Sequence, residues 1–227
     1  YTRLSGVEPW PGAALWSLAS FNAGTITMSQ SHTRSHRLLI IGAGGGGLCM
    51  AMQLKRAGID DFLIVDKAAG LGGTWWHNTY PGAECDVQSH LYSFSFEPKN
   101  DWSRPYAGQQ EILGYFQDCA DKYGLAAHTR FNTAVKALRW DDAASLWQVE
   151  TEQGETLQAQ VVVSALGMFN NLVWPKIPGI ADFKGNYFHS ARWDHAVDLN
   201  DQRVGVIGVA ASAIQFAPAI APKVRQL

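Results

Sequence analysis

The sequence predicts an α/β fold in which a parallel sheet is continued by an antiparallel meander and followed by the beginning of a second α/β unit. Two glycine loops, at residues 42–47 and 205–208, each separate an apolar strand-like run from a helical pattern. After the first loop and helix a further strand follows, and this order defines a βαβ unit with parallel strands. Three strand-like runs between the loops, separated by polar turns, predict the meander.

Length and composition fit a globular protein of one domain or two small ones. The 227 residues are 47% hydrophobic and 17% charged, with a formal net charge of -2. This charge offers no basic surface to a nucleic-acid backbone, so no nucleic-acid partner is expected. The longest uncharged run, residues 38–53, is too short to span a membrane. Three widely spaced cysteines form no disulfide or metal pattern. We therefore expect a cytoplasmic protein with no membrane attachment and no metal site.

Four segments are expected along the chain. Residues 1–34 show little periodicity and are predicted to be disordered or non-native, with Met28 as the natural start. A signal peptide is the alternative, since an apolar stretch follows Arg3. Residues 35–172 are predicted to form the first α/β domain, residues 173–202 a proline-containing linker, and residues 203–227 the truncated beginning of a second domain.

The elements of the first domain are predicted in chain order. A buried strand at residues 37–41 leads through the glycine loop into a helix that ends at Gly58, and residues 61–66 form the next strand. The apolar residues of this helix share one face: Leu48, Ala51, Met52 and Leu54. A second helix is predicted from Gln110 to Gly124, and the meander over residues 129–140, 146–152 and 157–167.

The first glycine loop carries the pattern of a dinucleotide site. Gly42, Gly44 and Gly47 fit GxGxxG between a strand and a helix, and Asp66 ends the next strand. Glycine permits the tight turn and lets a pyrophosphate approach the helix N-terminus, while the acid accepts from a ribose 2'-hydroxyl. A Rossmann-like domain that binds FAD or NAD, rather than NADP, is therefore predicted. The extra glycines, Gly45 and Gly46, are costly at a helix start and have no evident reason in the sequence.

The loop after Asp66 resembles a known family. It is rich in aromatic residues and glycine and is predicted to cover a flat ligand. Its pattern, [A/G]GxW, four residues, an aromatic, Pro-Gly, three residues and Asp, is a fingerprint of Baeyer-Villiger monooxygenases. All fixed positions match: Gly72, Gly73, Trp75, Tyr80, Pro81, Gly82 and Asp86.

A second stretch carries the other fingerprint of that family, FxGxxxHxxxW followed by Pro or Asp. The matching residues are Phe183, Gly185, His189, Trp193 and Asp194. Without the family, His189 would be read as an ordinary histidine and Trp193 as a packing anchor. The resemblance implies instead that both link two nucleotide domains. Related monooxygenases that oxidise nitrogen or sulfur usually have Tyr or Phe at the position of Trp193, so Trp193 favours Baeyer-Villiger chemistry.

The resemblance implies an FAD/NAD(P)-binding Rossmann-like domain followed by the start of an NADP-binding one. FAD and NADPH are the implied cofactors, and a ketone and O2 the implied substrates, with oxygen inserted through a peroxyflavin to give an ester or lactone. Asp86 is the implied catalytic residue, which would orient an arginine beside the flavin. The implied FAD residues are Gly42, Gly44, Gly47, Asp66, Gly73, Thr74, Trp75, Asp86, Tyr92 and Val135. The implied NADPH residues are Gly208, Ala211, Ser212 and Gln215.

The sequence also departs from the family pattern. Ala210 stands where the second loop usually has glycine, which is expected to weaken NADP(H) binding. The family's arginine beside the flavin is missing, and the second sheet is unfinished, so the chain is expected to be an N-terminal fragment. A heteroatom-oxidising flavin monooxygenase and a catalytically silent flavin-binding module remain the alternatives. A disulfide reductase is disfavoured, since no cysteine pair follows the first loop.

Overall fold

The computed structural model describes residues 35–227, and the predictions for residues 1–34 lie outside this part. The central element is a six-stranded sheet with the order β3-β2-β1-β6-β5-β4. Neighbours from β3 to β6 pair in parallel, and β6, β5 and β4 pair antiparallel. The predicted combination of a parallel sheet with a meander is confirmed. None of the helices in the described residues is long and apolar enough to cross a membrane.

The predicted βαβ unit opens the domain. Strand β1 (Ser35–Ile41) leads into α1 (Gly45–Arg56) and then β2 (Phe62–Val65). The two strands pair in parallel, with Leu39 opposite Leu63. Gly58, at a φ of 72°, follows the helix in the left-handed conformation that commonly ends helices. The apolar face that the sequence indicates is the buried one.

The meander consists of β4 (Val135–Asp141), β5 (Leu146–Thr151) and β6 (Thr156–Ser164). The first predicted run, however, is two strands, because a short β3 (Thr129–Arg130) pairs in parallel with β2 before the chain turns at Asn132. Asn132 has a φ of 52°, and its N–H donates to the Ala68 carbonyl, which turns the chain away from β2. Strand β6 pairs with both β5 and β1, so the meander continues the parallel sheet.

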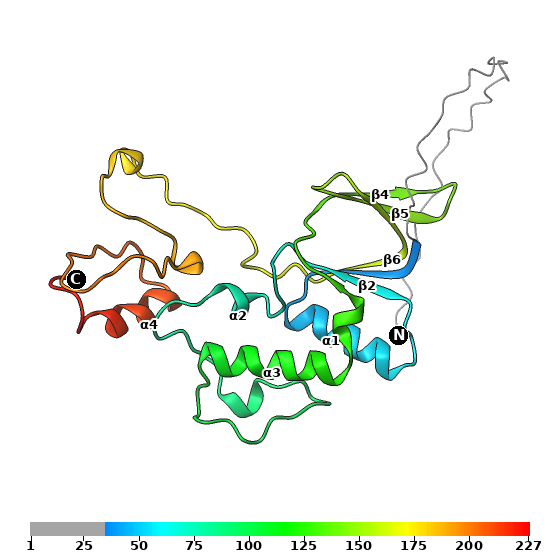
Figure 1. Ribbon diagram of the computed structural model, residues 1–227, viewed down its shortest axis with the longest axis horizontal. Helices are drawn as coiled ribbons and strands as arrows, with labels where there is room; N and C mark the ends of the chain where they lie inside the picture. Colours follow the sequence, from blue (N-terminus) through cyan, green and yellow to red (C-terminus); the bar gives the residue numbers. More distant parts are fainter. Residues whose placement is uncertain (1–34) are drawn as a thin grey trace, which may run out of the picture. The chain divides into compact units, whose positions relative to one another are not determined.

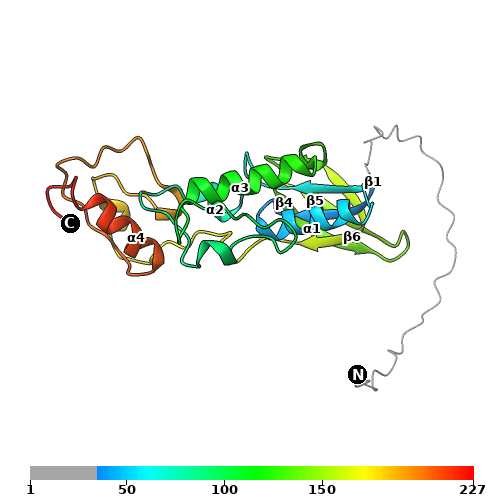
Figure 2. The ribbon, with the colours of Figure 1, turned by 90° about the horizontal axis from the view of Figure 1, so that it is seen from below.

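Two apolar layers enclose the parallel strands. Figure 1 shows α1 and α3 on one side of these strands and β4 and β5 on the other. Alternate residues of each strand face opposite sides, so Ile40 packs toward the helices and Leu39 toward the meander. Both side chains are fully buried. Figure 2, viewed from the helical side, shows α1 and α3 lying over the strands.

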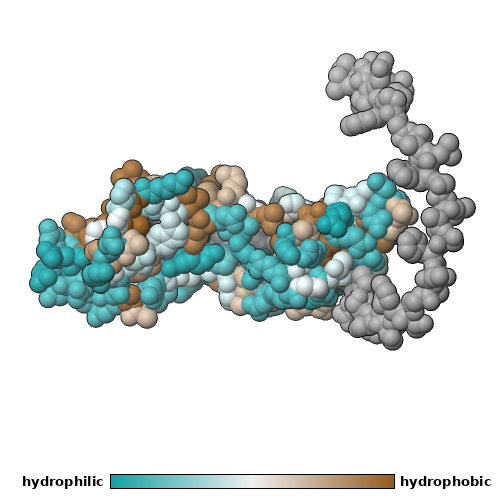
Figure 3. Space-filling model, turned by 90° about the horizontal axis from the view of Figure 1, so that it is seen from above, coloured by the Kyte–Doolittle hydropathy of each residue, from teal (hydrophilic) through white to brown (hydrophobic). Residues whose placement is uncertain are grey.

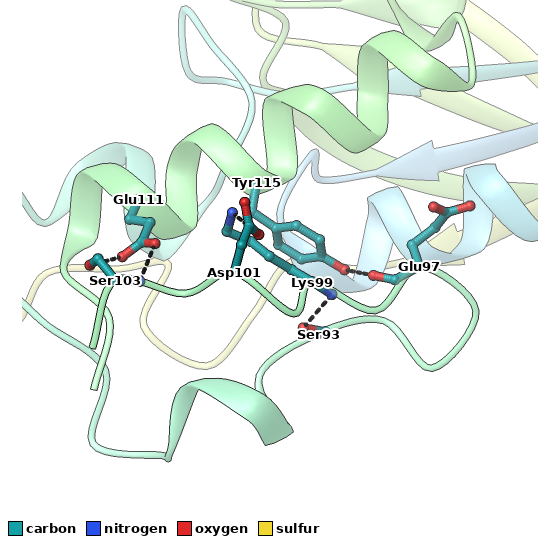
Figure 4. Close-up of polar contacts among 7 residues, drawn as sticks. All are labelled: Ser93, Glu97, Lys99, Asp101, Ser103, Glu111 and Tyr115. Atoms are coloured by element: carbon teal, nitrogen blue, oxygen red, sulfur yellow. Dashed lines mark hydrogen bonds and ion pairs between the residues drawn. The ribbon is translucent and has the colours of Figure 1, made fainter. Parts of the chain in front are cut away.

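Helix α3 (Gln109–Lys122) matches the predicted second helix, and Gly124 ends it with a φ of 64°. It anchors the long loop at residues 88–108, which includes the short helix η1 (Ser89–Leu91). The Tyr115 hydroxyl accepts from the Phe94 N–H at 2.8 Å and donates to the Glu97 carbonyl at 2.7 Å. Near the start of α3, Glu111 accepts from both the N–H and the hydroxyl of Ser103. Figure 4 shows the contacts of Tyr115 with Glu97 and of Glu111 with Ser103.

Replacing Tyr115 by phenylalanine is expected to destabilise the domain. The ring would still pack, but the Phe94 N–H and the Glu97 carbonyl would lose their shared partner, which costs about 1–3 kcal/mol. Urea unfolding measures this difference. Tyr106→Phe is the matched control, because Tyr106 is 43% exposed, and it is expected to lie within about 0.5 kcal/mol of wild type. Equal stability of the two variants would contradict this role for Tyr115.

The second α/β unit differs in one element from its prediction. Helix α4 (Ala211–Ile220) forms after the second glycine loop, but residues 203–207 form no strand ladder. A strand requires a hydrogen-bonded neighbour, and among the described residues only Gln226 bridges to Arg203, in parallel. Large apolar side chains are accordingly exposed, with Ile207 at 72% and Val209 at 89%. Figure 3 shows apolar surface on the part of the molecule that carries the linker and α4.

The remaining elements are short helices. They are α2 (Thr74–His77), η2 (Leu125–His128), η3 (Ile180–Asp182) and η4 (Ser190–Arg192). Helix α2 lies in the first fingerprint loop, and η4 lies within the second fingerprint.

Candidate functional site

A cavity of about 560 Å³ opens at the carboxyl ends of the central parallel strands. Ile41 at the end of β1, Val65 at the end of β2 and Ala165 after β6 all line it. Strand β1 lies between β2 and β6 in the sheet; the chain passes from β1 through α1 to β2 on one side, while β6 on the other side leads into the linker. In open α/β sheets such a point is where ligands bind, and the volume lies in the range of ligand sites.

The first glycine loop closes the inner end of this cavity. Gly42 has a φ of 110°, and a Cβ there would lie 2.4 Å from the Ala165 carbonyl oxygen. A Cβ on Gly47 would lie 1.8 Å from the Gly42 carbonyl oxygen. Both positions therefore require glycine, one for the turn and one for the packing of α1 against it. Gly42 lines the cavity, whereas Gly47 is buried behind it.

The aromatic loop crosses directly over the glycine loop. A Cβ on Gly73, at a φ of 56°, would lie 2.9 Å from Gly44 Cα, and the Gly72 N–H donates to the Ala43 carbonyl. This backbone-to-backbone approach explains the glycine at position 73. A Cβ on the extra Gly45 would lie 3.3 Å from the ring of Phe116, which is a tight contact.

The N-terminus of α1 lies at the cavity. Gly44 is the N-cap and offers no side-chain acceptor, and the first turn contains no acidic residue. Gly44, Gly45 and Gly46 line the cavity. An uncapped helix N-terminus with exposed N–H groups and the positive end of the helix dipole is suited to bind an anion such as a pyrophosphate.

Asp66 follows β2 and organises the glycine loop from the opposite side. Its carboxylate accepts from the Ala43 N–H at 2.6 Å and from the Ala68 N–H at 2.7 Å. A carboxylate has about four acceptor positions, so these two bonds leave capacity for a ribose hydroxyl. Asp66 lines the cavity, and the structure thus adds a structural role to the predicted ligand contact.

An aromatic pair forms one wall of the cavity. Trp75 donates from Nε1 to the Tyr92 hydroxyl at 3.0 Å, and the rings meet edge to face with centroids 5.8 Å apart. The Gln109 side-chain amide donates to the Trp75 carbonyl and ties the wall to α3. Burial raises the pKa of the Tyr92 hydroxyl, so it remains protonated at neutral pH. A rigid, apolar wall of this kind suits a flat ring system.

The cavity gathers most of the predicted FAD residues. It is lined by Gly42, Gly44, Asp66, Gly73, Thr74, Trp75, Tyr92 and Val135. Asp86 does not line the cavity and its side chain is exposed, so its catalytic role stays a prediction.

The structure also adds lining residues that the sequence reasoning missed. The segment after β6 contributes Leu166 and Gly167, and the second fingerprint contributes Arg192. For Leu166 and Gly167 the only signal in the sequence is the Ala-Leu-Gly at the end of a strand. For Arg192 the only signal is its place next to Trp193. Lys67 and His77 line the cavity as well.

His77 is expected to make stability depend on pH. Burial, followed by the nearby charge of Arg192, lowers the pKa of His77 from its ordinary value of 6.5. The unfolded chain therefore binds this proton more readily, and stability falls as the pH drops through 6.5. Thermal melting from about pH 7.5 to about pH 5.5 should show a shallower decline in His77→Gln than in wild type. Identical slopes would contradict this contribution of His77.

The second fingerprint forms a set of aromatic contacts. Trp193 packs between Phe188 and Phe216, with centroid distances of 5.1 and 5.3 Å. His189 Nδ1 accepts from the Ala191 N–H, and its ring meets Trp174 edge to face. Phe183, Gly185 and Asp194 are exposed, and Asp194 caps the following turn by accepting from the Ala196 N–H. The anchor role for Trp193 is therefore visible in the packing.

The predicted NADPH residues lie at the start of α4. Gly208 has a φ of 116° and borders open space where a Cβ would lie, while Ala210 is the N-cap and Ala211 begins the helix. Ser212 lies in the first turn of α4. Gln215 lies one turn further, and both ends of its carboxamide are hydrogen-bonded to the aromatic loop.

The fold and the site together define a nucleotide-binding α/β oxidoreductase domain, with a phosphate loop at the carboxyl edge of its parallel strands. Residues 39–224 match the family described as pyridine nucleotide-disulphide oxidoreductase, and the chain belongs to this family. The resemblance stated from the two fingerprints is confirmed, because the chain is homologous to Baeyer-Villiger monooxygenases. It is 51% identical over 191 residues to one from Streptomyces coelicolor, covering 84% of this chain and 37% of that protein. It is 48% identical over 217 residues to one from Pseudomonas aeruginosa, covering 94% and 41%.

Solved structures agree with this assignment. Cyclohexanone monooxygenase from Rhodococcus sp. Phi1 bound to NADP+ matches with a TM-score of 0.79 and 37% identity, over 85% of this chain and 37% of that chain. An oxidized steroid monooxygenase bound to NADP matches with a TM-score of 0.79 and 39% identity, over 85% and 38%. The chain thus spans about two fifths of the length of the relatives that it matches.

Proposed function

We propose that the protein carrying this sequence is an FAD-dependent, NADPH-using monooxygenase that inserts one oxygen atom of O2 into a ketone to give an ester or lactone. The observation that carries the proposal is the crossing of the two loops at Gly44 and Gly73, which joins a phosphate site to an aromatic wall in one cavity. The relatives support it, since those named above are Baeyer-Villiger monooxygenases.

The described residues fit FAD on three structural grounds. Gly42 and Gly44 line the cavity without side chains, the N-terminus of α1 is uncapped, and the Asp66 carboxylate retains free acceptor positions. We assign the pyrophosphate to the N-terminus of α1, a ribose hydroxyl to Asp66, and the flat ring to the side of Trp75 and Tyr92. When bound, FAD supplies the electron-transfer and oxygen chemistry, while the chain binds it, orients it and excludes water.

We assign the domains accordingly. Residues 35–172 form the FAD-binding domain, residues 173–202 the linker, and residues 203–227 the beginning of the NADP-binding domain. NADPH is assigned to the second glycine loop, at Gly208, Ala211 and Ser212, on the basis of the family pattern. Asp86 is retained as the proposed partner of a basic group near the flavin.

Thiol chemistry has no support in the structure. The chain's three cysteines, Cys49, Cys85 and Cys119, are all within the described residues and none is paired. Burial raises the pKa of the Cys85 and Cys119 thiols, so neither is an activated nucleophile. The disulphide chemistry in the family's description is therefore not proposed for this chain.

Turnover of a ketone tests the proposed function. The purified protein should consume NADPH faster when a cyclic ketone is added, and mass spectrometry with labelled O2 should find one labelled oxygen atom in the ester or lactone. Oxidation of sulfides or amines, with no ketone product, would replace the proposal by the heteroatom-oxidising alternative. Flavin binding with no NADPH consumption on any substrate would favour the silent module.

A further inference from the structure

The first fingerprint loop divides into two parts with different neighbours. Residues 72–78 line the cavity, through Gly73, Trp75 and His77 among others. The following residues leave the cavity and pack against α4, where Tyr80 and Ala83 join a separate apolar cluster with Phe216 and Ile220. The loop therefore connects the proposed flavin site to the helix that follows the second glycine loop.

Gln215 on α4 is hydrogen-bonded to the loop. Its Oε1 accepts from the Tyr80 hydroxyl at 2.8 Å, and its Nε2 donates to the Glu84 carbonyl at 2.9 Å. The two partners lie four residues apart, so a single carboxamide spans the turn of the loop. Both ends of the Gln215 side chain are thus directed to the loop, and the predicted contact of Gln215 with the nicotinamide nucleotide stays a prediction.

Gly82 lets the loop approach α4 closely enough for these bonds. It has a φ of 78°, and a Cβ there would lie 2.8 Å from the Gln215 carbonyl oxygen and 3.2 Å from the Ala219 Cβ. The backbone of the loop thus lies directly against the backbone of the helix. The Tyr-Pro-Gly part of the fingerprint is explained by this contact, since only glycine fits between loop and helix.

Further aromatic and polar contacts lie beside this contact between the loop and α4. Tyr80 meets Phe216 with ring centroids 6.1 Å apart, and Phe216 in turn contacts Trp193. The Thr79 hydroxyl and His195 Nε2 are 2.8 Å apart. Both fingerprints therefore converge on α4 at Gln215 and Phe216, although they are about a hundred residues apart in the chain.

We propose that Gln215 is a positioning residue, which fixes α4 and the second glycine loop relative to the Trp75 wall of the flavin cavity. This inference rests on the proposed function, because it concerns hydride transfer from a nucleotide at the second loop to a flavin in the cavity. Gln215 acts through Tyr80 and Glu84 and does not contact the nucleotide.

The test compares Tyr80→Phe, Gln215→Met and the double variant, with Tyr106→Phe as the control at an exposed tyrosine. Hydrogen exchange is measured on the amides of residues 79–84. Tyr80→Phe should raise exchange there by about three- to tenfold, as expected for one lost hydrogen bond, and Gln215→Met, which loses two, by at least as much. The double variant should add little to the larger single effect, because the two side chains act as one unit.

Two functional measurements separate positioning from ligand contact and from packing alone. The rate of flavin reduction at saturating NADPH, without oxygen, should fall by about three- to tenfold in both single variants, while the Kd for NADP+ changes by less than about twofold. Weaker NADP+ binding in Gln215→Met but not in Tyr80→Phe would show direct contact and overturn the inference. Unchanged exchange, or raised exchange with an unchanged reduction rate, would overturn it as well. If NADPH does not reduce the wild-type flavin, the proposed function itself fails, whereas reduction in wild type with unaffected variants refutes only the inference.

Discussion

Replacing Gly44 by alanine is expected to give a folded protein that has lost most of its bound flavin. The position has a φ of -82°, which alanine adopts without strain, and the new Cβ would lie 3.4 Å from Gly73 Cα, an ordinary contact. The methyl group would nevertheless occupy the cavity wall where a pyrophosphate approaches the N-terminus of α1. Loss of one charge-assisted hydrogen bond costs about 1.5–3 kcal/mol, or roughly ten- to hundredfold in affinity for FAD.

The matched variant Gly47→Ala should fail in a different way. A Cβ at Gly47 would lie 1.8 Å from the Gly42 carbonyl oxygen, so the backbone must move, at a cost of about 3 kcal/mol or more. Melting temperature and the ratio of flavin to protein absorbance are measured on both variants. Full flavin content in Gly44→Ala, or wild-type stability in Gly47→Ala, would refute the geometry of the first loop.

Replacing Asp66 by alanine is expected to reduce both stability and flavin binding. The Ala43 and Ala68 N–H groups would lose their shared carboxylate, and hydrogen bonds to a charged group are worth about 1.5–3 kcal/mol each. We expect the free energy of unfolding in the absence of flavin to fall by about 2–4 kcal/mol, which urea titration measures. The affinity for FAD should fall further, because the proposed ribose acceptor is also removed.

Asp66→Asn separates the two roles of Asp66. In wild type each carboxylate oxygen accepts from one N–H group, whereas the amide has only one acceptor oxygen and keeps one of the two bonds. The stability of Asp66→Asn should therefore lie between those of wild type and Asp66→Ala. Equal stability of all three proteins would show that the bonds of Asp66 to the loop contribute nothing. A fully flavin-loaded Asp66→Ala protein would remove the ribose assignment.

The sequence was sufficient for the elements whose signals are local. The glycine loop, the helix face at Leu48 and Met52, and Gly124 after α3 each depend on neighbouring residues, and each is observed. The aromatic wall was also predictable, because the spacing of Trp75 in the loop is part of a fixed pattern. The first three features need only periodicity and turn chemistry, whereas the wall rests on the resemblance to the family's fingerprint.

The features that were missed depend on contacts between distant segments. The pairing of β6 with both β1 and β5 joins strands that are far apart in the chain, and no local pattern indicates it. Arg192 lines the cavity but belongs to the linker, and the sequence does not indicate where the linker runs in space. For Gln215 the family pattern predicts a contact with a nucleotide, and the structure adds a hydrogen bond from its carboxamide to a loop 131 residues away. Motif matching supplies the residue type but not its partner.

Asp86 is a fingerprint residue that does not line the cavity. It is a fixed position of the first motif, but its side chain is exposed and lies outside the cavity lining. Its neighbour Cys85 is buried and holds the loop by accepting from the Val87 N–H. The proposed role of Asp86 therefore depends on a basic partner outside the cavity residues described above, and Asp86→Asn should leave flavin content unchanged while lowering turnover.

The most direct test of the flavin assignment is the visible absorption spectrum of the purified protein, together with identification of the released cofactor. We expect the spectrum of oxidised flavin, with one FAD per chain that is released on denaturation. A soluble, cooperatively folded protein that is colourless and does not bind added FAD would contradict the assignment of the cavity between the glycine loop and the Trp75 wall.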